Sequence, residues 1–256
     1  MNTPDAAKAR RRAIAAAERS VALAPSLADG YAARSRMLND FRWDFAGADK
    51  DEARALALAP NSPFVLILHC INRRSRGRLA ESADACRRAI ELDPLTVGGR
   101  NQLTFTYLVD GEIAKARALN TRALEISPAS RAAQFNRCTL DIFEGNRVGA
   151  NDHCASLADE EDRFYYKAMM LEEWGTSLEA DQSIAAFVAR FGEEDPATVA
   201  DLFAWRGDAD RAFEWLDRAY DQHVGLGDIK GDWALRKIRA DPRYAALLKK
   251  MNMPLD

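Results

Sequence analysis

The sequence predicts an all-α solenoid of antiparallel helix pairs, because three features recur with a period close to 34 residues. Prolines stop helical runs at intervals of 35, 34 and 34 residues, at Pro25, Pro60, Pro94 and Pro128. Small residues keep the same rhythm at Ala13, Ala48, Ser82, Ala116, Ala150, Ala180 and Ala212. Turn glycines stand five residues before the later members of that series, at Gly77, Gly111, Gly145, Gly175 and Gly207. A fixed period of this size indicates stacked copies of one supersecondary unit.

Each unit contains a helical stretch of about 13 residues, a short turn with glycine, and a second stretch of about 14 residues. Residues 7–27 lack a first helix and are predicted as a half-repeat of a solenoid that spans 1–220. Complete pairs are expected over 28–62, 63–96, 97–130, 131–160, 161–192 and 193–220. Twelve positions before the second-helix series, the first helices also carry small residues, at Cys70, Thr104, Cys138, Ala168 and Ala200. The two helices of a pair are therefore expected to cross closely.

This pattern resembles the tetratricopeptide repeat (TPR) family, whose helix–turn–helix unit of 34 residues carries small residues, a turn glycine and a closing proline at fixed positions. Residues 97–130 match best, with Thr104, Gly111, Ala116, Ala123 and Pro128 in place. Residues 131–192 follow the pattern least closely. The resemblance implies a right-handed superhelix that binds proteins or peptides.

Two phrases, FRWDFAGADKDEARALALAPN and DLFAWRGDADRAFEWLDRAYDQ, further resemble the C-terminal repeat region of bacterial signalling proteins. In those proteins the region follows a nucleotide cyclase, a Ser/Thr kinase or a winged-helix domain. None of these domains is visible here. The chain is therefore expected to be either a fragment of such a protein or a stand-alone relative.

Residues 221–256 leave the period and are predicted as a glycine-containing connection followed by a short helical cap. A solenoid must cover its last exposed face, and a terminal element with one apolar side can do so. The expected buried side of this cap is Trp233, Leu235, Ile238, Tyr244 and Leu247.

Charge and hydropathy exclude some classes of partner and some cellular locations. A net charge of −3 argues against a general nucleic-acid binder. No apolar run approaches the ~20 residues that a membrane helix needs, and the N-terminus lacks the apolar core of a secretory signal. The sequence therefore predicts a cytoplasmic protein that binds neither nucleic acid nor membranes.

Four cysteines form two pairs at matching repeat positions, Cys70 with Cys86 and Cys138 with Cys154. Each pair is expected to face across one helix hairpin. Free cysteine packs well where helices cross, so reduced, buried thiols are predicted, with an oxidisable pair or a metal site as the less favoured alternatives.

Nothing in the sequence points to catalysis. Only three histidines occur, and no phosphate loop, zincin motif or nucleophile elbow is present. The acidic runs 159–162 and 193–195 are expected to be solvated helix caps. Arg73, Arg74 and Arg76 are expected to be solvated cations at a helix end, with an acidic partner as the alternative. No catalytic residue, metal or cofactor is assigned.

The resemblance places the concave surface on the first helix of each pair, at four positions of each repeat. Those positions are unusually apolar here and indicate a groove for a partner segment. The predicted binding residues are Phe64, Ile67, Ile71, Asn101, Phe105, Leu108, Phe135, Ile142, Tyr165 and Met169. Alternatively, a tight superhelix or the C-terminal segment buries this face.

The sequence thus predicts a non-catalytic protein-interaction module, a scaffold whose partner is a protein or peptide. Two other classes stay open. One is a regulatory sensor that binds a peptide or small ligand, and the other is a homo-oligomerisation module.

Overall fold

A computed structural model describes residues 4–254, and within this range it is built from helices without a strand. The predicted all-α solenoid is confirmed. The α-helices are α1 (Pro4–Leu23), α2 (Ala28–Met37), α3 (Phe45–Leu58), α4 (Pro63–Ser75), α5 (Leu79–Leu92), α6 (Val97–Asp110), α7 (Ile113–Ile126), α8 (Arg131–Phe143), α9 (Arg147–Ala155), α10 (Glu160–Trp174), α11 (Ser177–Phe191), α12 (Pro196–Arg206), α13 (Ala209–Gln222) and α14 (Pro242–Lys250). Three shorter elements complete the description: the π-helix η1 (Leu38–Arg42) and the 3₁₀-helices η2 (Leu226–Gly231) and η3 (Ala234–Lys237).

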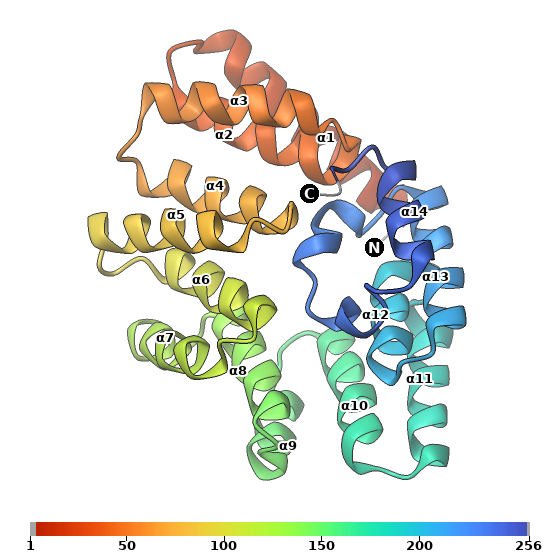
Figure 1. Cartoon of the computed structure of the whole chain (residues 1–256). Coiled ribbons are helices and arrows are strands. Elements are labelled where there is room, and N and C mark those ends of the chain that lie inside the picture. The colour runs from red at the N-terminus through yellow and green to blue at the C-terminus, as the bar shows by residue number, and fades with distance from the viewer. Residues whose placement is uncertain (1–3, 255–256) are drawn as a thin grey trace.

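Successive helices pack as antiparallel pairs, α2 with α3, α4 with α5, and so on to α12 with α13 (Figure 1). The pairs follow one another around a curved array, with the first helix of each pair nearer its centre. The exact division into units stays a prediction from the repeat.

Local chemistry explains why the first helices begin where they do. After Pro60, Pro94 and Pro128, the residue two places later caps the next helix, because its hydroxyl accepts a hydrogen bond from a backbone N–H of the first turn, whereas Leu27 after Pro25 makes no such cap. The bonds run from Val65 to Ser62, from Gly99 to Thr96 and from Ala133 to Ser130. The repeated sequence therefore encodes both a helix stop and the following helix start.

All but the first of the periodic small residues lie where their spacing predicts. Ala48, Ser82, Ala116, Ala150, Ala180 and Ala212 are buried, and so are their first-helix counterparts, whereas Ala13 in the half-repeat is exposed. In the pair α4–α5 the counterparts touch directly, because Cys70 Sγ lies 3.4 Å from Ser82 Oγ. Small side chains at these crossings let the helices approach closely.

Two disulfides correct the prediction of reduced thiols. Cys70 is bonded to Cys86 between α4 and α5, and Cys138 is bonded to Cys154 between α8 and α9. The expectation that each pair faces across its hairpin is confirmed. The tight crossing brings the Cα atoms to 5.5 and 5.3 Å, which is disulfide range, so the geometry that suits a packed thiol also suits a bridge.

The basic cluster after α4 is also different from its prediction. Arg73, Arg74 and Arg76 are buried. Arg73 pairs with Glu52 of the preceding repeat, and the Arg76 guanidinium lies 4.6 Å from the centre of the Phe45 ring. These arginines join neighbouring repeats instead of facing solvent, because their long apolar stems can be buried while the charged ends find acceptors.

The C-terminal segment does more than cover the last repeat. Trp233, Leu235, Ile238, Tyr244 and Leu247 are buried as expected. However, residues 226–240 run back through the centre of the array, where η3 packs on α12 and η2 reaches α4 and η1 (Figure 1).

Contacts across the array fix this path. Asn39 donates a hydrogen bond of 3.1 Å to the Gly227 carbonyl, and Arg74 pairs with Asp228 at 2.9 Å. The two ends of the solenoid also meet, because the Trp43 ring stacks on Tyr220 with ring centres 5.2 Å apart. The superhelix is therefore closed, and its own C-terminal segment occupies much of the concave side.

Candidate functional site

Several cavities lie on the concave side, between the first helices and the C-terminal segment, and two of them share four lining residues. One has a volume of about 280 Å³ and lies among α8, α10, α12 and the segment that leads into η3. The other, about 470 Å³, lies among α4, α6, α8 and η2. Phe105, Arg131, Phe135 and Asp162 line both, so the two cavities form one groove, which we call the central groove.

Aromatic side chains form much of its wall. Phe105 comes from α6, Phe135 from α8, Tyr165 from α10, and Trp233 from the segment before η3. Neighbouring rings hold them in place: Phe135 packs edge-on against Tyr166 at 5.0 Å, and Trp233 against Phe143 at 5.4 Å. Both of these wall residues are therefore packed against a second aromatic ring.

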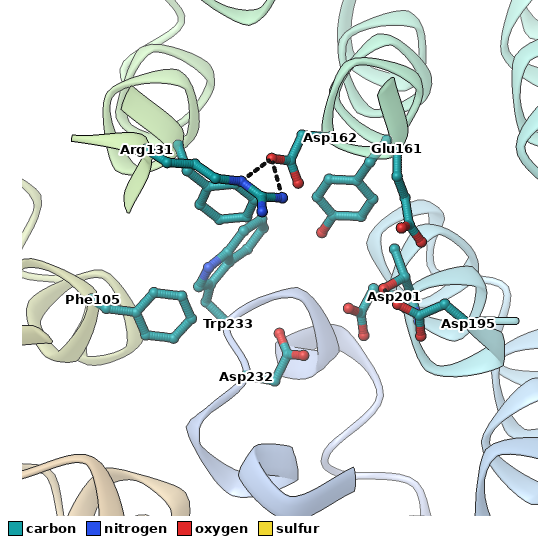
Figure 2. Close-up of a pocket in the computed structure, with 11 residues that line it drawn as sticks. Phe105, Arg131, Glu161, Asp162, Asp195, Asp201, Asp232 and Trp233 are labelled. Atoms are coloured by element: carbon teal, nitrogen blue, oxygen red, sulfur yellow. Dashed lines mark hydrogen bonds and ion pairs between the residues drawn. The ribbon is translucent and has the colours of Figure 1, made fainter. Parts of the chain in front are cut away.

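Five carboxyl groups converge on the smaller cavity: Glu161, Asp162, Asp195, Asp201 and Asp232. Figure 2 shows Asp195, Asp201 and Asp232 on the side opposite Arg131 and Asp162. Arg131 is the single basic residue among the side chains that line this cavity, and it pairs with Asp162 at 2.9 Å and with Asp159 at 3.1 Å.

This crowding changes the protonation of the carboxyl groups. Burial, followed by the charge of Asp232, raises the pKa of Asp201 well above its ordinary value. Burial raises the pKa of Asp232 to about 6, although a backbone N–H at Ala234 donates to it. Burial, followed by the charge of Asp195, also raises the pKa of Glu161. Carboxyl groups that lack a cationic partner in a confined space hold their protons more tightly.

The larger cavity has a different chemistry. Arg74 lies 4.4 Å above the Phe105 ring and donates to the side chain of Gln102 at 2.8 Å. Asn101 donates to Ser130 at 3.1 Å, while its side-chain oxygen is buried without a hydrogen-bond partner in the described part of the chain. Amides of this kind suit the polar backbone of an extended segment.

The predicted binding residues are placed at three depths. Phe64 is exposed and Ile67 and Ile71 are half-buried on α4. Asn101, Phe105, Phe135 and Tyr165 line the central groove. Leu108, Ile142 and Met169 are buried, in one hydrophobic cluster with the C-terminal residues. A partner that leaves the C-terminal segment in place therefore reaches only the first two groups.

The acidic side of the groove was not among the predicted site residues. Asp195 caps α12, as predicted for that run, but it also lines the cavity. Asp201 follows the small residue Ala200 just as Phe105 follows Thr104, so extending the concave register to the last repeat would have found it. Asp232 lies outside the period, and no repeat signal marks it.

Comparisons with solved structures agree on the fold. PilW, a widely conserved type IV pilus biogenesis factor, superposes with a TM-score of 0.60 at 17% identity, over 75% of this chain and 90% of PilW. PilF of Pseudomonas aeruginosa gives 0.54 at 15% identity, over 82% and 90% of the two chains. A chain of the Cut9–Hcn1 complex of the APC/C gives 0.61 at 12% identity, over 94% of this chain and 52% of that one.

No family model matches the sequence, and no curated protein matches it significantly. The fold is nevertheless that of a TPR superhelix, as the repeat pattern and the packed helix pairs both show. No helix in residues 4–254 is long and apolar enough to cross a membrane.

Proposed function

We propose that this chain is a non-catalytic interaction module that binds a segment of a partner protein in the central groove. The observation that carries the proposal is the groove itself, an aromatic-walled hollow left open between α6, α8, α10 and the C-terminal segment. Concave, rigid and partly apolar hollows with a few polar groups are where proteins bind ligands.

The size of the groove favours a short stretch of a partner over a whole domain. Phe105 and Phe135 offer ring surface to such a segment. Phe64, Ile67 and Ile71 extend the apolar surface along α4 beyond the groove. An extended segment that lies across α4, α6 and α8 would contact both the central groove and this surface of α4.

A sensor role is the second candidate, and one observation favours it. The C-terminal segment both lines the groove and contacts α4 and η1 at the other end of the array. A ligand in the groove would touch the element that closes the superhelix, so its binding would stabilise the closed form. Homo-oligomerisation and a link to bacterial signalling stay predictions from the sequence.

The disulfides bear on location. Disulfides persist in oxidising compartments and are rare in the cytoplasm. Two buried bridges therefore support an oxidising location over the cytoplasmic one expected from the sequence. We assign no catalytic residue to the groove.

Selection of peptides tests the proposal. A random peptide library is panned on the purified chain, and the affinities of selected peptides are measured by fluorescence anisotropy. Replacing Phe105 and Phe135 together by serine should weaken binding by more than ~2 kcal/mol, about 30-fold, as expected for central aromatic anchors. Val148→Ser, an exposed residue of α9, is the matched control and should bind normally.

Circular dichroism distinguishes the ways in which the test can fail. A double variant that stays helical and still binds the peptides places the site elsewhere. A double variant that loses its helical signal shows that both rings belong to the core and not to a binding surface.

A further inference from the structure

Most carboxyl groups of the smaller cavity have no ion-pair partner within residues 4–254. Buried carboxylates elsewhere have basic partners: Glu52 pairs with Arg73 and His69, and Asp141 with Arg117 and His153. In the described part of the chain, no ion pair joins a basic side chain to the four other carboxyl groups of this cavity, Glu161, Asp195, Asp201 and Asp232. Arg131 is already held by Asp162 and Asp159 at the rim. A cation from outside the chain would supply the missing partner.

A tyrosine hydroxyl that lines the same cavity also lacks a hydrogen-bond partner in the described part of the chain. Tyr165 is only 6% exposed, and its ring is held by Tyr166 and Phe187 at ring-centre distances of 5.2 and 6.4 Å. Its hydroxyl makes no hydrogen bond to any residue that the structure describes, whereas the neighbouring Tyr166 hydroxyl is bonded to Thr139 and to the Phe135 carbonyl. Buried tyrosine hydroxyls usually find a partner, so this one is free to accept a hydrogen bond from a ligand.

The walls specify what kind of cation fits. Aromatic faces attract organic cations, and this chain already places Arg74 over Phe105 in the central groove. A metal ion is disfavoured by the spread of the carboxylates, because no group of three or more His, Cys, Asp or Glu side chains within residues 4–254 is arranged to hold one. An ammonium or guanidinium group can use both the rings and the dispersed oxygens.

We infer that the smaller cavity binds the side chain of a lysine or arginine carried by the partner segment, an inference that rests on the function proposed above. The cationic head lies between the carboxyl groups and donates to the Tyr165 hydroxyl, and its stem lies along Phe135 and Trp233. A volume of about 280 Å³ accommodates one such side chain. The partner's backbone then continues into the larger cavity beside Asn101.

Three amino-acid probes test the inference without knowledge of the partner: Nα-acetyl lysine, arginine and norleucine methylamides. Norleucine has the stem of lysine without its charge. The probes are titrated into the full chain at low salt, and binding is followed by the indole N–H resonance of Trp233. We expect the lysine or arginine probe to bind at least tenfold more tightly than norleucine.

Single-residue variants test whether the cationic probes bind in the smaller cavity. Asp201→Asn keeps the shape and removes a carboxyl group that an entering cation would ionise, and it should weaken the lysine and arginine probes at least tenfold without affecting norleucine. Tyr165→Phe, which removes only the hydroxyl, should weaken them several-fold. Glu173→Gln is the matched control, because Glu173 is an exposed carboxylate of α10, the helix that carries Tyr165.

The outcomes separate this inference from the proposed function. Equal affinity for lysine and norleucine, or cationic probes that bind Asp201→Asn like the wild type, overturns the inference. Selected peptides that need Phe105 and Phe135 but lack any basic residue overturn it as well while the proposed function stands. If the cationic probes bind as expected but the selected peptides do not need Phe105 and Phe135, the cation site stands and the proposed function is overturned.

Discussion

Ala116→Leu tests the repeat register that underlies the whole fold. Ala116 lies on α7 with no exposed surface, at the position that Ser82 holds one repeat earlier. There, Ser82 touches Cys70 in its own pair at 3.4 Å and Thr106 in the next at 2.9 Å. The same register sets Ala116 between Thr104 and Leu140, which are also fully buried. Three added carbon atoms therefore have no free volume to enter.

Overpacking of this kind costs about 1–3 kcal/mol, which is a large part of a typical stability. For a chain of this size, each kcal/mol lowers the melting temperature by roughly 2–4 °C, so we expect a loss of roughly 2–12 °C. Circular dichroism at 222 nm measures the shift. Ala118→Leu, at an exposed position of the same helix, is the control and should change stability by no more than about 0.5 kcal/mol. Equal melting temperatures for the two variants would refute the register.

Two further predictions concern the cysteines and the carboxyl groups of Asp201 and Asp232. Mass spectrometry without reductant should find no free thiol, and free thiols in the native chain would contradict the two disulfides. Replacing Cys70 and Cys86 by serine should lower the free energy of unfolding by about 3 kcal/mol, as expected for a 16-residue separation. Because the pKa of Asp232 is about 6 when folded, above its ordinary value near 4, the folded state binds more protons between these values. The contribution of Asp201 and Asp232 to the free energy of unfolding should therefore grow as the pH falls from 7 to 5. Asp201→Asn removes one of these two carboxyl groups with a raised pKa and should flatten that dependence in urea titrations; an unchanged slope would contradict the raised pKa of Asp201.

The solenoid was predictable because its signals are local. A proline, a hydroxyl two residues later and a small residue at each crossing act within one helix pair, and they repeat. Pro94, Thr96 and Ala116 show the three roles around the pair α6–α7. Spacing also placed Cys70 opposite Cys86, but spacing alone does not determine whether two adjacent thiols are oxidised.

The route of the C-terminal segment was not predictable from these signals. Arg74 and Asp228 are 154 residues apart, and no period relates them. Because residues 221–256 do not repeat, no signal in the sequence marked Asp232, and Trp233 was predicted only to lie on the buried side of the cap. Since the central groove exists between repeating helices and a non-repeating segment, the sequence showed its aromatic wall but not its acidic side.

Photo-crosslinking is the measurement that tests most directly whether the concave side binds a partner segment. A selected peptide carries benzoylphenylalanine at one position at a time, and mass spectrometry identifies the residues it labels. We predict labels on α6, α8, α10 and residues 226–240, with excess unlabelled peptide suppressing them. Labels confined to the outer helices α5, α7, α9 and α11 would contradict the account.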